Sequence, residues 1–407
     1  MTQVLRLALL VLVSTVVLAF CFQFGTSIID DIPLRNSIVI AFLAAFSAYI
    51  SVRNLARFPG ERSWFSLQPV VVLWFGLAVL VVMLFRIPHS VAYLLASFML
   101  TALYVQFDDW YFDKRKKLVL AYAPFGRAQG AHRIPHAEWI RMDTPCLPAE
   151  SIDGVVTDLH ARDMTTEWQK FLAECTLQHI PVYNIRQVEE SLTGRVRIMH
   201  MYENELGSLL PSETYSFIKR ILESALVLAV MPVVLPIMAI TTIAIMLESP
   251  GGAMFLQRRV GQFGKEFTIY KFRSMCKDSE KDGAKFASAG DMRVTRIGKF
   301  IRKTRIDELP QFFNVLKGDM ALIGPRPEQK AFVDKFEDVI PFYSYRHVVK
   351  PGITGWAQVV HGYAADVGET QVKIEHDFYY IKNFSFGLDV LIVMKTIYTM
   401  VTGFGAR

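Results

Sequence analysis

Two adjacent carboxylates, Asp307 and Glu308, stand in the stretch of the chain that is most suggestive of chemistry. Adjacent acids are usually solvated residues of a helix surface. Here, cations precede the pair and the sequence Gly324-Pro-Arg-Pro327 follows it. The cations are Arg302, Lys303 and Arg305. Such a mixture could hold an anionic phosphate while one carboxylate is free to attack it, so the stretch favours covalent phosphoryl chemistry.

The acid pair is expected at the start of a helix. The pattern predicts that Asp307 lies at or just before the first turn of a helix that runs to about Lys317 and ends at Gly318. Pro310 fits only the first turn. Free backbone N–H groups and the helix dipole there would attract a phosphate. An attacking carboxylate must stay ionised, and Arg302, Arg305 and a bound metal would lower its pKa.

Further phosphate-binding residue types lie on both sides of the helix. They occur in Ser249-Pro-Gly-Gly252, Gln257-Arg-Arg-Val-Gly261, Tyr270-Lys-Phe-Arg-Ser-Met275 and Arg293-Val-Thr-Arg-Ile-Gly298. Each block alone is a weak signal, because a basic run is usually a solvated face or a lipid anchor. Nucleic-acid binding also needs basic residues, but the aromatic side chains are not grouped as stacking platforms, so no nucleic acid is expected.

The elements that carry these residues begin with a membrane unit. The chain has 407 residues, of which 52% are hydrophobic, and a formal net charge of +6. Four apolar stretches in residues 1–113 are long enough to cross a hydrocarbon core of about 30 Å as helices. They are Leu5–Phe24, Ser37–Val52, Leu67–Phe85 and Ser90–Phe107. The first has no convincing cleavage site, so we expect a retained helix.

Loop charges predict the orientation of this unit. Arg53, Arg57 and Arg62 accompany the second connection, and Lys114-Arg-Lys-Lys117 follows the fourth span. Both ends are therefore expected in the cytoplasm, and the chain from Lys114 onward is expected to begin on the cytoplasmic face of the membrane. The four cysteines have no CxxC spacing, so neither a disulfide nor a zinc site is expected.

Residues 114–200 read as a small α/β, Rossmann-like insert. Strands are predicted at Leu118–Tyr122, Gly154–Leu159 and Pro181–Ile185, with a helix at Glu167–Ile180. The order resembles part of a nucleotide-binding half-domain, but no GxGxxG fingerprint is present. A structural or regulatory module is therefore favoured over a cofactor site. Residues 201–218 read as a linker.

Residues 219–248 form an almost wholly apolar run that contains Pro232 and Pro236. Basic residues flank both ends, which favours the same side of the membrane for both. Interior prolines bend or break helices. We therefore expect a re-entrant membrane helix-break-helix, with a kinked fifth spanning helix as the alternative. Residues 249–407 would then form a mixed, mainly α catalytic domain.

From about Lys219 to Leu391 the chain closely resembles the bacterial monotopic phosphoglycosyl transferases, also called bacterial sugar transferases. The resemblance is carried by YKFRSM, RIGKFIRKTRIDELPQFFNVLKGDMALIGPRP, KPGITGWAQV and DFYYIKNFSFGLDV. With the spans and insert, it extends to the large members that initiate exopolysaccharide, O-antigen or capsule synthesis. The resemblance implies transfer of a sugar 1-phosphate from a UDP-sugar to polyprenyl (undecaprenyl) phosphate, with release of UMP.

The resemblance also implies roles for residues. Asp307 would be the nucleophile that forms an aspartyl phospho-sugar, and Glu308 would position or activate the incoming groups. Mg²⁺ would be held by Asp307 and substrate oxygens. Candidate substrate-binding residues are Lys271, Arg273, Arg302, Arg305, Arg326, Asp377 and Tyr380. Asp377 and Tyr380 fit a packing role equally well. UDP-glucose or UDP-galactose is the expected donor, and the four-helix unit could be a homodimer platform.

Several positions depart from the family pattern. Leu235-Pro236 stands for Ser-Pro, Glu223 for an aspartate and Lys350 for an arginine. The segment Val360-His-Gly-Tyr363 also differs, in a region expected to touch the sugar, so the sugar is most open there.

Three other functions fit the sequence less well. A non-catalytic scaffold of a polysaccharide-assembly complex would need neither the acid pair nor Arg326, and both are present. A UDP-releasing glycosyltransferase would be expected to carry a DxD motif, and Asp108-Asp109 adjoins a membrane span instead. A transporter would need ionisable groups at the centres of the spans, which are apolar.

Overall fold

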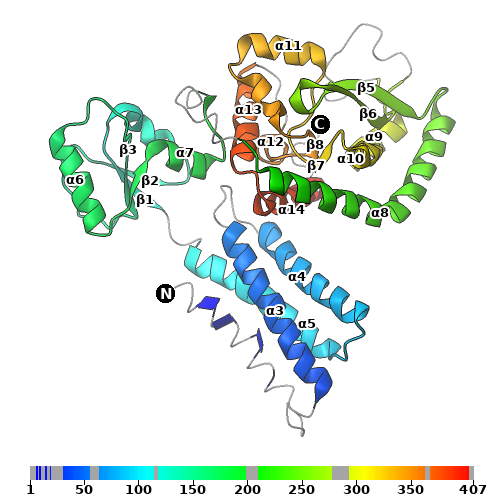
Figure 1. The fold of residues 1–407 in the computed structure, drawn as a ribbon, viewed down its shortest axis with the longest axis horizontal. Helices are drawn as coiled ribbons and strands as arrows, with labels where there is room; N and C mark the ends of the chain where they lie inside the picture. Colours follow the sequence, from blue (N-terminus) through cyan, green and yellow to red (C-terminus); the bar gives the residue numbers. More distant parts are fainter. Residues whose placement is uncertain are drawn as a thin grey trace. The chain divides into compact units, whose positions relative to one another are not determined.

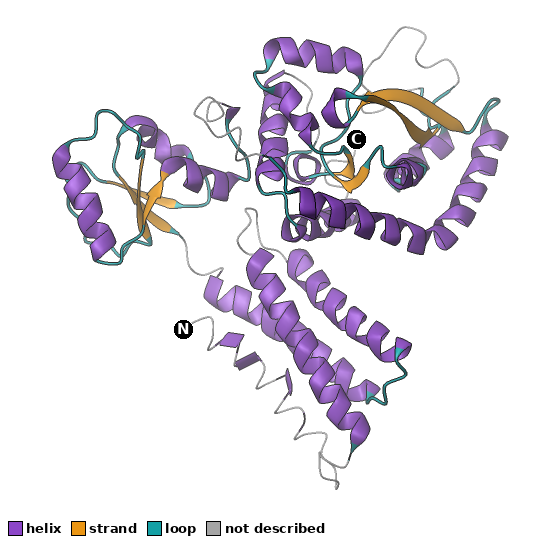
Figure 2. Cartoon of the chain, in the orientation of Figure 1, coloured by secondary structure: helices purple, strands orange, loops and turns teal. Residues whose placement is uncertain are grey.

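The computed structural model describes residues 31–55, 64–113, 118–198, 210–276, 293–362 and 367–402, together with seven isolated positions between 6 and 19. It divides into two compact units, Met1–Gly194 and Arg195–Arg407. Figure 1 labels their elements, and helices predominate in both (Figure 2).

Three apolar helices of the first unit pack side by side: α3 (Ile32–Leu55), α4 (Trp64–Leu84) and α5 (Val91–Asp108) (Figure 1). Ser37 Oγ accepts a hydrogen bond from Ser90 N at 2.7 Å, and Arg53 pairs with the buried Asp108. In the described part of the chain, four helices are long and apolar enough to cross a membrane: these three and α8. The predicted span Leu5–Phe24 lies mostly outside the described residues.

The α/β insert contains a four-stranded parallel sheet in the order β2-β1-β3-β4. The strands are β1 (Val119–Tyr122), β2 (Glu138–Arg141), β3 (Gly154–Thr157) and β4 (Val182–Asn184). Helix α6 (Thr166–Leu177) packs on one face, and α7 (Ile185–Thr193) with a 3-10 helix (Gly126–Arg133) on the other. The three predicted strands and the helix are confirmed, whereas β2 and α7 were not predicted.

The second unit is mixed and mainly helical, as expected. It contains a hairpin, β5 (Met254–Val260) with β6 (Glu266–Phe272), and a parallel pair, β7 (Ala321–Ile323) with β8 (Gly352–Thr354). Its helices are α8 (Glu213–Glu248), α9 (Arg296–Lys303), α10 (Gln311–Lys317), α11 (Lys330–Val339), α12 (Trp356–Val360), α13 (Val367–Lys382) and α14 (Phe386–Thr402).

Helix α8 differs from the expected helix-break-helix. Its backbone stays α-helical through Pro232 and Pro236, and the helix bends instead of breaking (Figure 1). It also begins at Glu213, with Ser212 as its N-cap, so the second half of the predicted linker is helical. The prolines therefore act as bend points, the usual cause of a sharp bend in a long helix.

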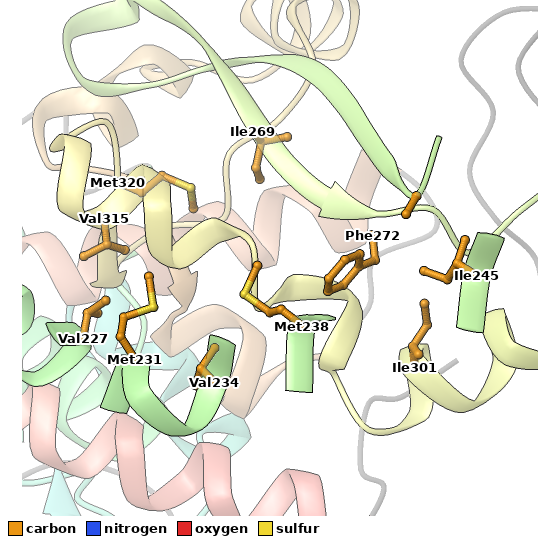
Figure 3. Packing of buried hydrophobic residues seen from close by; sticks show 11 residues of the cluster. Val227, Met231, Val234, Met238, Ile245, Ile269, Phe272, Ile301, Val315 and Met320 are labelled. Atoms are coloured by element: carbon orange, nitrogen blue, oxygen red, sulfur yellow. The ribbon is translucent and has the colours of Figure 1, made fainter. Parts of the chain in front are cut away.

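Both arms of α8 pack on one core. Its inner face carries Val227, Met231 and Val234 on one arm and Ile245 near the far end, and these residues meet side chains of β6, α9 and α10 (Figure 3). The partners include Ile269, Phe272, Ile301, Val315 and Met320. The outer face is also apolar yet exposed, with Val233 at 66% and Ile240 at 69%. An apolar surface of this size calls for an apolar environment.

Candidate active site

The acid pair lies in a tight turn between α9 and α10. Arg305 adopts a left-handed conformation (φ 59°), and a 3-10 turn, Ile306–Glu308, follows it directly. Helix α10 then ends at Lys317, with Gly318 as a left-handed cap (φ 89°). The predicted position of Asp307 and the predicted end of the helix are confirmed. The chain changes direction at Arg305, so the cations at the end of α9 are followed directly by the turn that carries the two acids.

Several backbone N–H groups around the start of α10 are engaged within the turn itself. The N–H groups of Glu308, Leu309, Phe312 and Phe313 each donate to a carbonyl three residues earlier. Donors spent inside a turn cannot also hold an anion. These four N–H groups are therefore not available to an anion near Asp307, whereas the surrounding cationic side chains are.

Glu308 is the buried centre of a cluster of cations. It is 7% exposed, and its Oε1 lies 3.0 Å from Arg326 Nη2, 3.8 Å from Lys271 Nζ and 3.9 Å from Arg305 Nη1. Burial alone would raise the pKa of this carboxyl, but Arg326, Lys271 and Arg305 outweigh it and lower the pKa to about 2. Glu308 is therefore ionised throughout the physiological range and fixes the three cations around itself.

Asp307 has the opposite electrostatic environment. Burial, and then the charge of Glu308, raise its pKa to about 6, against the lowering effect of Lys271 and Arg326. Arg305 lowers this pKa as expected, but burial and the charge of Glu308 outweigh the cations, so the net shift is upward. Asp307 Oδ1 is buried and has no hydrogen-bond partner among the described residues. An ionised carboxylate that is poorly compensated is a better nucleophile than a well-paired one.

Lys271 completes the cluster from β6. Burial and the charge of Arg326 lower the pKa of its ammonium to about 8, so it stays mostly protonated at neutral pH. Because its pKa is lowered, the charged form of Lys271 is poorly stabilised by its surroundings. It would gain from an arriving phosphate.

Arg326 is held in place by the loop that carries it. Its Nη1 donates to Gln358 Oε1 at 3.2 Å, and its carbonyl accepts from Arg346 Nη2 at 2.9 Å. Arg346 is in turn paired with the buried Asp377 at 2.8 Å. The loop packs so closely that a Cβ on Gly324 would lie 2.3 Å from the carbonyl oxygen of Lys350. The guanidinium is therefore preorganised before any substrate arrives.

The structure brings together Asp307, Glu308, Lys271, Arg305 and Arg326 of the predicted set. Four other predicted residues lie apart from this cluster. Arg273 donates to Ser249 and Pro250 at the end of α8, and Asp377 pairs with Arg346. Tyr380 Oη lies 2.9 Å from Asp389 Oδ1. Arg302 shows no ion pair with either acid among the described residues. Asp377 and Tyr380 are both buried and hydrogen-bonded within the fold, and their two alternative roles stay predictions.

Three amide side chains of the site were not singled out from the sequence. Asn314 joins α10 to β6, since its Nδ2 donates to Thr268 O at 2.7 Å and its Oδ1 accepts from Tyr270 N at 3.1 Å. Gln358 holds Arg326, and Gln311 is 2% exposed. The sequence cue that could have identified them is their position within largely apolar helical stretches, because a buried amide usually has a hydrogen-bond partner.

In the described part of the chain, the carboxylate of Asp307 offers an unpartnered oxygen as a ligand for a metal ion. Among the described residues, no group of three or more His, Cys, Asp or Glu side chains is placed to hold an ion. The unpartnered Oδ1 of Asp307 is a hard oxygen donor of the kind that Mg²⁺ prefers. The site therefore fits an Mg²⁺ ion that takes its remaining ligands from a diphosphate and water.

Fold and site together define a membrane-associated protein in which cations surround an acid pair in the turn between α9 and α10. The family model for bacterial sugar transferases matches residues 214–403, which include all of these elements. The chain is also 54% identical over 376 residues to the UDP-N-acetylgalactosamine-undecaprenyl-phosphate N-acetylgalactosaminephosphotransferase of Aeromonas hydrophila. That match covers 91% of this chain and 88% of the relative. The chain belongs to the bacterial sugar transferase family.

Two further relatives have a different sugar in their names. UDP-glucose:undecaprenyl-phosphate glucose-1-phosphate transferase of Caulobacter vibrioides is 40% identical over 199 residues, 48% of this chain and 74% of the relative. The enzyme of the same name from Escherichia coli is 34% identical over 229 residues, 55% of this chain and 48% of the relative.

Proposed function

We propose that this protein transfers a sugar 1-phosphate from a UDP-sugar to polyprenyl phosphate and releases UMP. The observation that carries the proposal is the acid pair itself. Glu308 is held ionised by three cations, and beside it Asp307 has an unpartnered oxygen. One acid thus organises the cations for a diphosphate, and the other is available to attack it.

The reaction proceeds in two displacements at phosphorus. In the first, an Asp307 oxygen forms a bond to the β-phosphorus, and the bond from that phosphorus to the bridging oxygen breaks, so that UMP leaves with the electron pair. In the second, a phosphate oxygen of the polyprenyl phosphate attacks the same phosphorus and Asp307 leaves as a carboxylate. Lys271 and Arg326 neutralise the charge of the phosphoryl oxygens in both steps. When bound, Mg²⁺ would supply further neutralisation of the diphosphate, with Asp307 as its ligand from the protein.

N-acetylgalactosamine 1-phosphate is the transferred group that the comparisons favour. The relative from Aeromonas hydrophila, whose name contains this sugar, is 54% identical across 91% of the chain, whereas the two glucose relatives named above match at 34% and 40% over 55% and 48% of it. We therefore propose UDP-N-acetylgalactosamine as the donor, in place of the UDP-glucose or UDP-galactose expected from the sequence.

Helix α8 is proposed to enter and leave the membrane on one side. Near its start, Lys219 Nζ lies 2.5 Å from Asp389 Oδ2 of α14, and at its end Glu248 Oε1 accepts from Ile297 N at 3.1 Å. Both ends are thus tied to the same compact unit. A helix that crossed the bilayer would separate its ends by about 30 Å of hydrocarbon. The bend lets the exposed outer face lie in lipid while the inner face stays on the catalytic core.

Cysteine labelling tests this topology. Arg220→Cys and Arg258→Cys introduce thiols at exposed positions beside the two ends of α8. In oriented bacterial inner-membrane vesicles, an impermeant maleimide should label both from the cytoplasmic side. Labelling from opposite sides would show that α8 crosses the membrane.

The activity is tested with purified protein in lipid, undecaprenyl phosphate, Mg²⁺ and a panel of UDP-hexoses and UDP-N-acetylhexosamines. UMP and UDP are measured separately. UMP from UDP-N-acetylgalactosamine, abolished in a folded Asp307→Asn protein, is the expected result. UDP as product would identify an ordinary glycosyltransferase, and UMP release by Asp307→Asn at the wild-type rate would remove Asp307 from its role.

A further inference from the structure

Gln311 is a buried amide that the fold does not use. It is the first residue of α10 and is 2% exposed, yet its Nε2 has no hydrogen-bond partner among the described residues. A buried donor without a partner destabilises the folded state. A leucine or methionine would fill the same space without that cost. The amide is therefore expected to have a partner when the protein works.

The position of Gln311 points to that partner. The backbone is right-handed helical between the acids and α10, with Leu309 at φ −55°, ψ −37° and Pro310 at φ −60°, ψ −18°. Gln311 follows Glu308 by three residues and Asp307 by four, and both spacings place side chains on the same helical face. The unused donor thus lies on the face that carries the acid pair.

A second unpartnered atom lies on the same face. Asp307 Oδ1 is a buried acceptor and Gln311 Nε2 a buried donor, and neither bonds to the other. Glu308, in contrast, is already engaged by Arg326 and Lys271. A group that binds at Asp307 and offers acceptor oxygens would satisfy both unpartnered atoms at once. A phosphoryl group attached to Asp307 has this chemistry.

We propose that Gln311 donates a hydrogen bond from Nε2 to a phosphoryl oxygen of the sugar 1-phosphate during its transfer to Asp307. This role rests on the proposed function. Gln311 neither gains nor loses a proton: the bond that forms joins Asp307 to phosphorus, and the bond that breaks releases UMP. The amide stabilises the charge on the oxygen that it contacts as the phosphorus changes partners.

The test compares isosteric variants. Gln311→Met keeps the length of the side chain and removes the donor, and Gln311→Glu keeps the shape but presents acceptors. The matched control is Gln262→Met, which removes an amide that donates to Val348 O at 3.1 Å. UMP release is followed in single turnovers at several UDP-N-acetylgalactosamine concentrations, with thermal unfolding measured in parallel.

We expect Gln311→Met and Gln311→Glu to slow UMP release at saturating donor by about 100-fold, the usual effect of removing one charge-stabilising donor. Their Tm should equal or exceed that of the wild type, since no folded-state hydrogen bond is lost. Gln262→Met should react at the wild-type rate. A Gln311→Met rate within about threefold of wild type, or a loss confined to KM, would overturn the inference. If Gln311→Met does not fold, Gln311→Glu decides by the same criteria.

The Asp307→Asn protein separates this inference from the function on which it rests. If Asp307→Asn is inactive and Gln311→Met is fully active, only the role of Gln311 is wrong. If Asp307→Asn releases UMP normally, the proposed function fails whatever Gln311 does.

Discussion

Asp307→Asn should inactivate the protein and stabilise it, whereas Glu308→Gln should destabilise it. Asp307 has a pKa of about 6 in the folded chain against an ordinary value of 3.8, because it is buried beside Glu308. A raised carboxyl pKa means that stability is fully present below the unfolded pKa and falls as the pH rises through the folded one. At neutral pH the charge on Asp307 therefore opposes folding, and asparagine removes that opposition.

The pKa difference gives the magnitude. A shift of about two units corresponds to about 3 kcal/mol, and a unit the size of Arg195–Arg407 gains about 2–4 °C in Tm per kcal/mol. Asp307→Asn should raise Tm by up to about 10 °C at pH 7.5. The charge of Glu308 has the opposite effect on stability. The pKa of Glu308 is about 2 in the folded chain, below its ordinary value of 4.5, so its contribution to stability is present above pH 4.5 and is lost as the pH falls toward 2. Glu308→Gln should lower Tm by a comparable amount.

Thermal unfolding of the three proteins in the same detergent, at pH 7.5 and pH 5.0, tests both signs. At pH 5.0 about half of the gain from Asp307→Asn should be gone, because Asp307 is then largely protonated in the folded wild type. The loss from Glu308→Gln should be almost unchanged at that pH. Equal destabilisation by the two substitutions at pH 7.5 would show that the acids are not electrostatically distinct.

Three further results are expected. The rate of UMP release should rise about tenfold per pH unit up to about pH 6 and then level off, as Asp307 ionises; a flat profile from pH 4.5 to 7 would contradict this. Gln358→Leu should slow UMP release by about tenfold without changing Tm by more than a few degrees, because Arg326 loses the contact that fixes Nη1. Gly324→Ala should cost more than about 3 kcal/mol in unfolding measurements, since its Cβ would overlap the Lys350 carbonyl oxygen at 2.3 Å.

The parts of the site that the sequence predicted are those set by local chemistry. The position of Asp307 before its helix and the end of that helix at Gly318 follow from residues within a few positions, whereas the orientation of Arg326 depends on Gln358 and Arg346. The parts that were missed depend on tertiary contacts. Arg273 has the residue type of a phosphate ligand, but it donates to Ser249 and Pro250 because the hairpin brings it to the end of α8. Spacing alone does not show which oxygen a cation reaches.

The fold shows the same division. The apolar spans were predicted from their length and composition, and the α/β strands from periodicity. Strand β2 of the insert has only half-buried and exposed residues, so its sequence has no pattern strong enough to predict it. Helix α8 was predicted to break because prolines weaken helices. It stays continuous because its inner face is buried on the catalytic core along both arms, and that packing outweighs two lost hydrogen bonds.

The two acids of the site show why adjacent residues of the same type can have different roles. Arg326, Lys271 and Arg305 converge on Glu308, and although all three also lower the pKa of Asp307, burial and the charge of Glu308 outweigh them there. Asp307 is partly buried, lies next to a negative charge and has an unpartnered oxygen. The binding of a phosphate together with a cation would therefore stabilise its charged form most. The cost of keeping Asp307 in this state is expected to appear as the stability that Asp307→Asn gains, so reactivity and instability have the same physical origin.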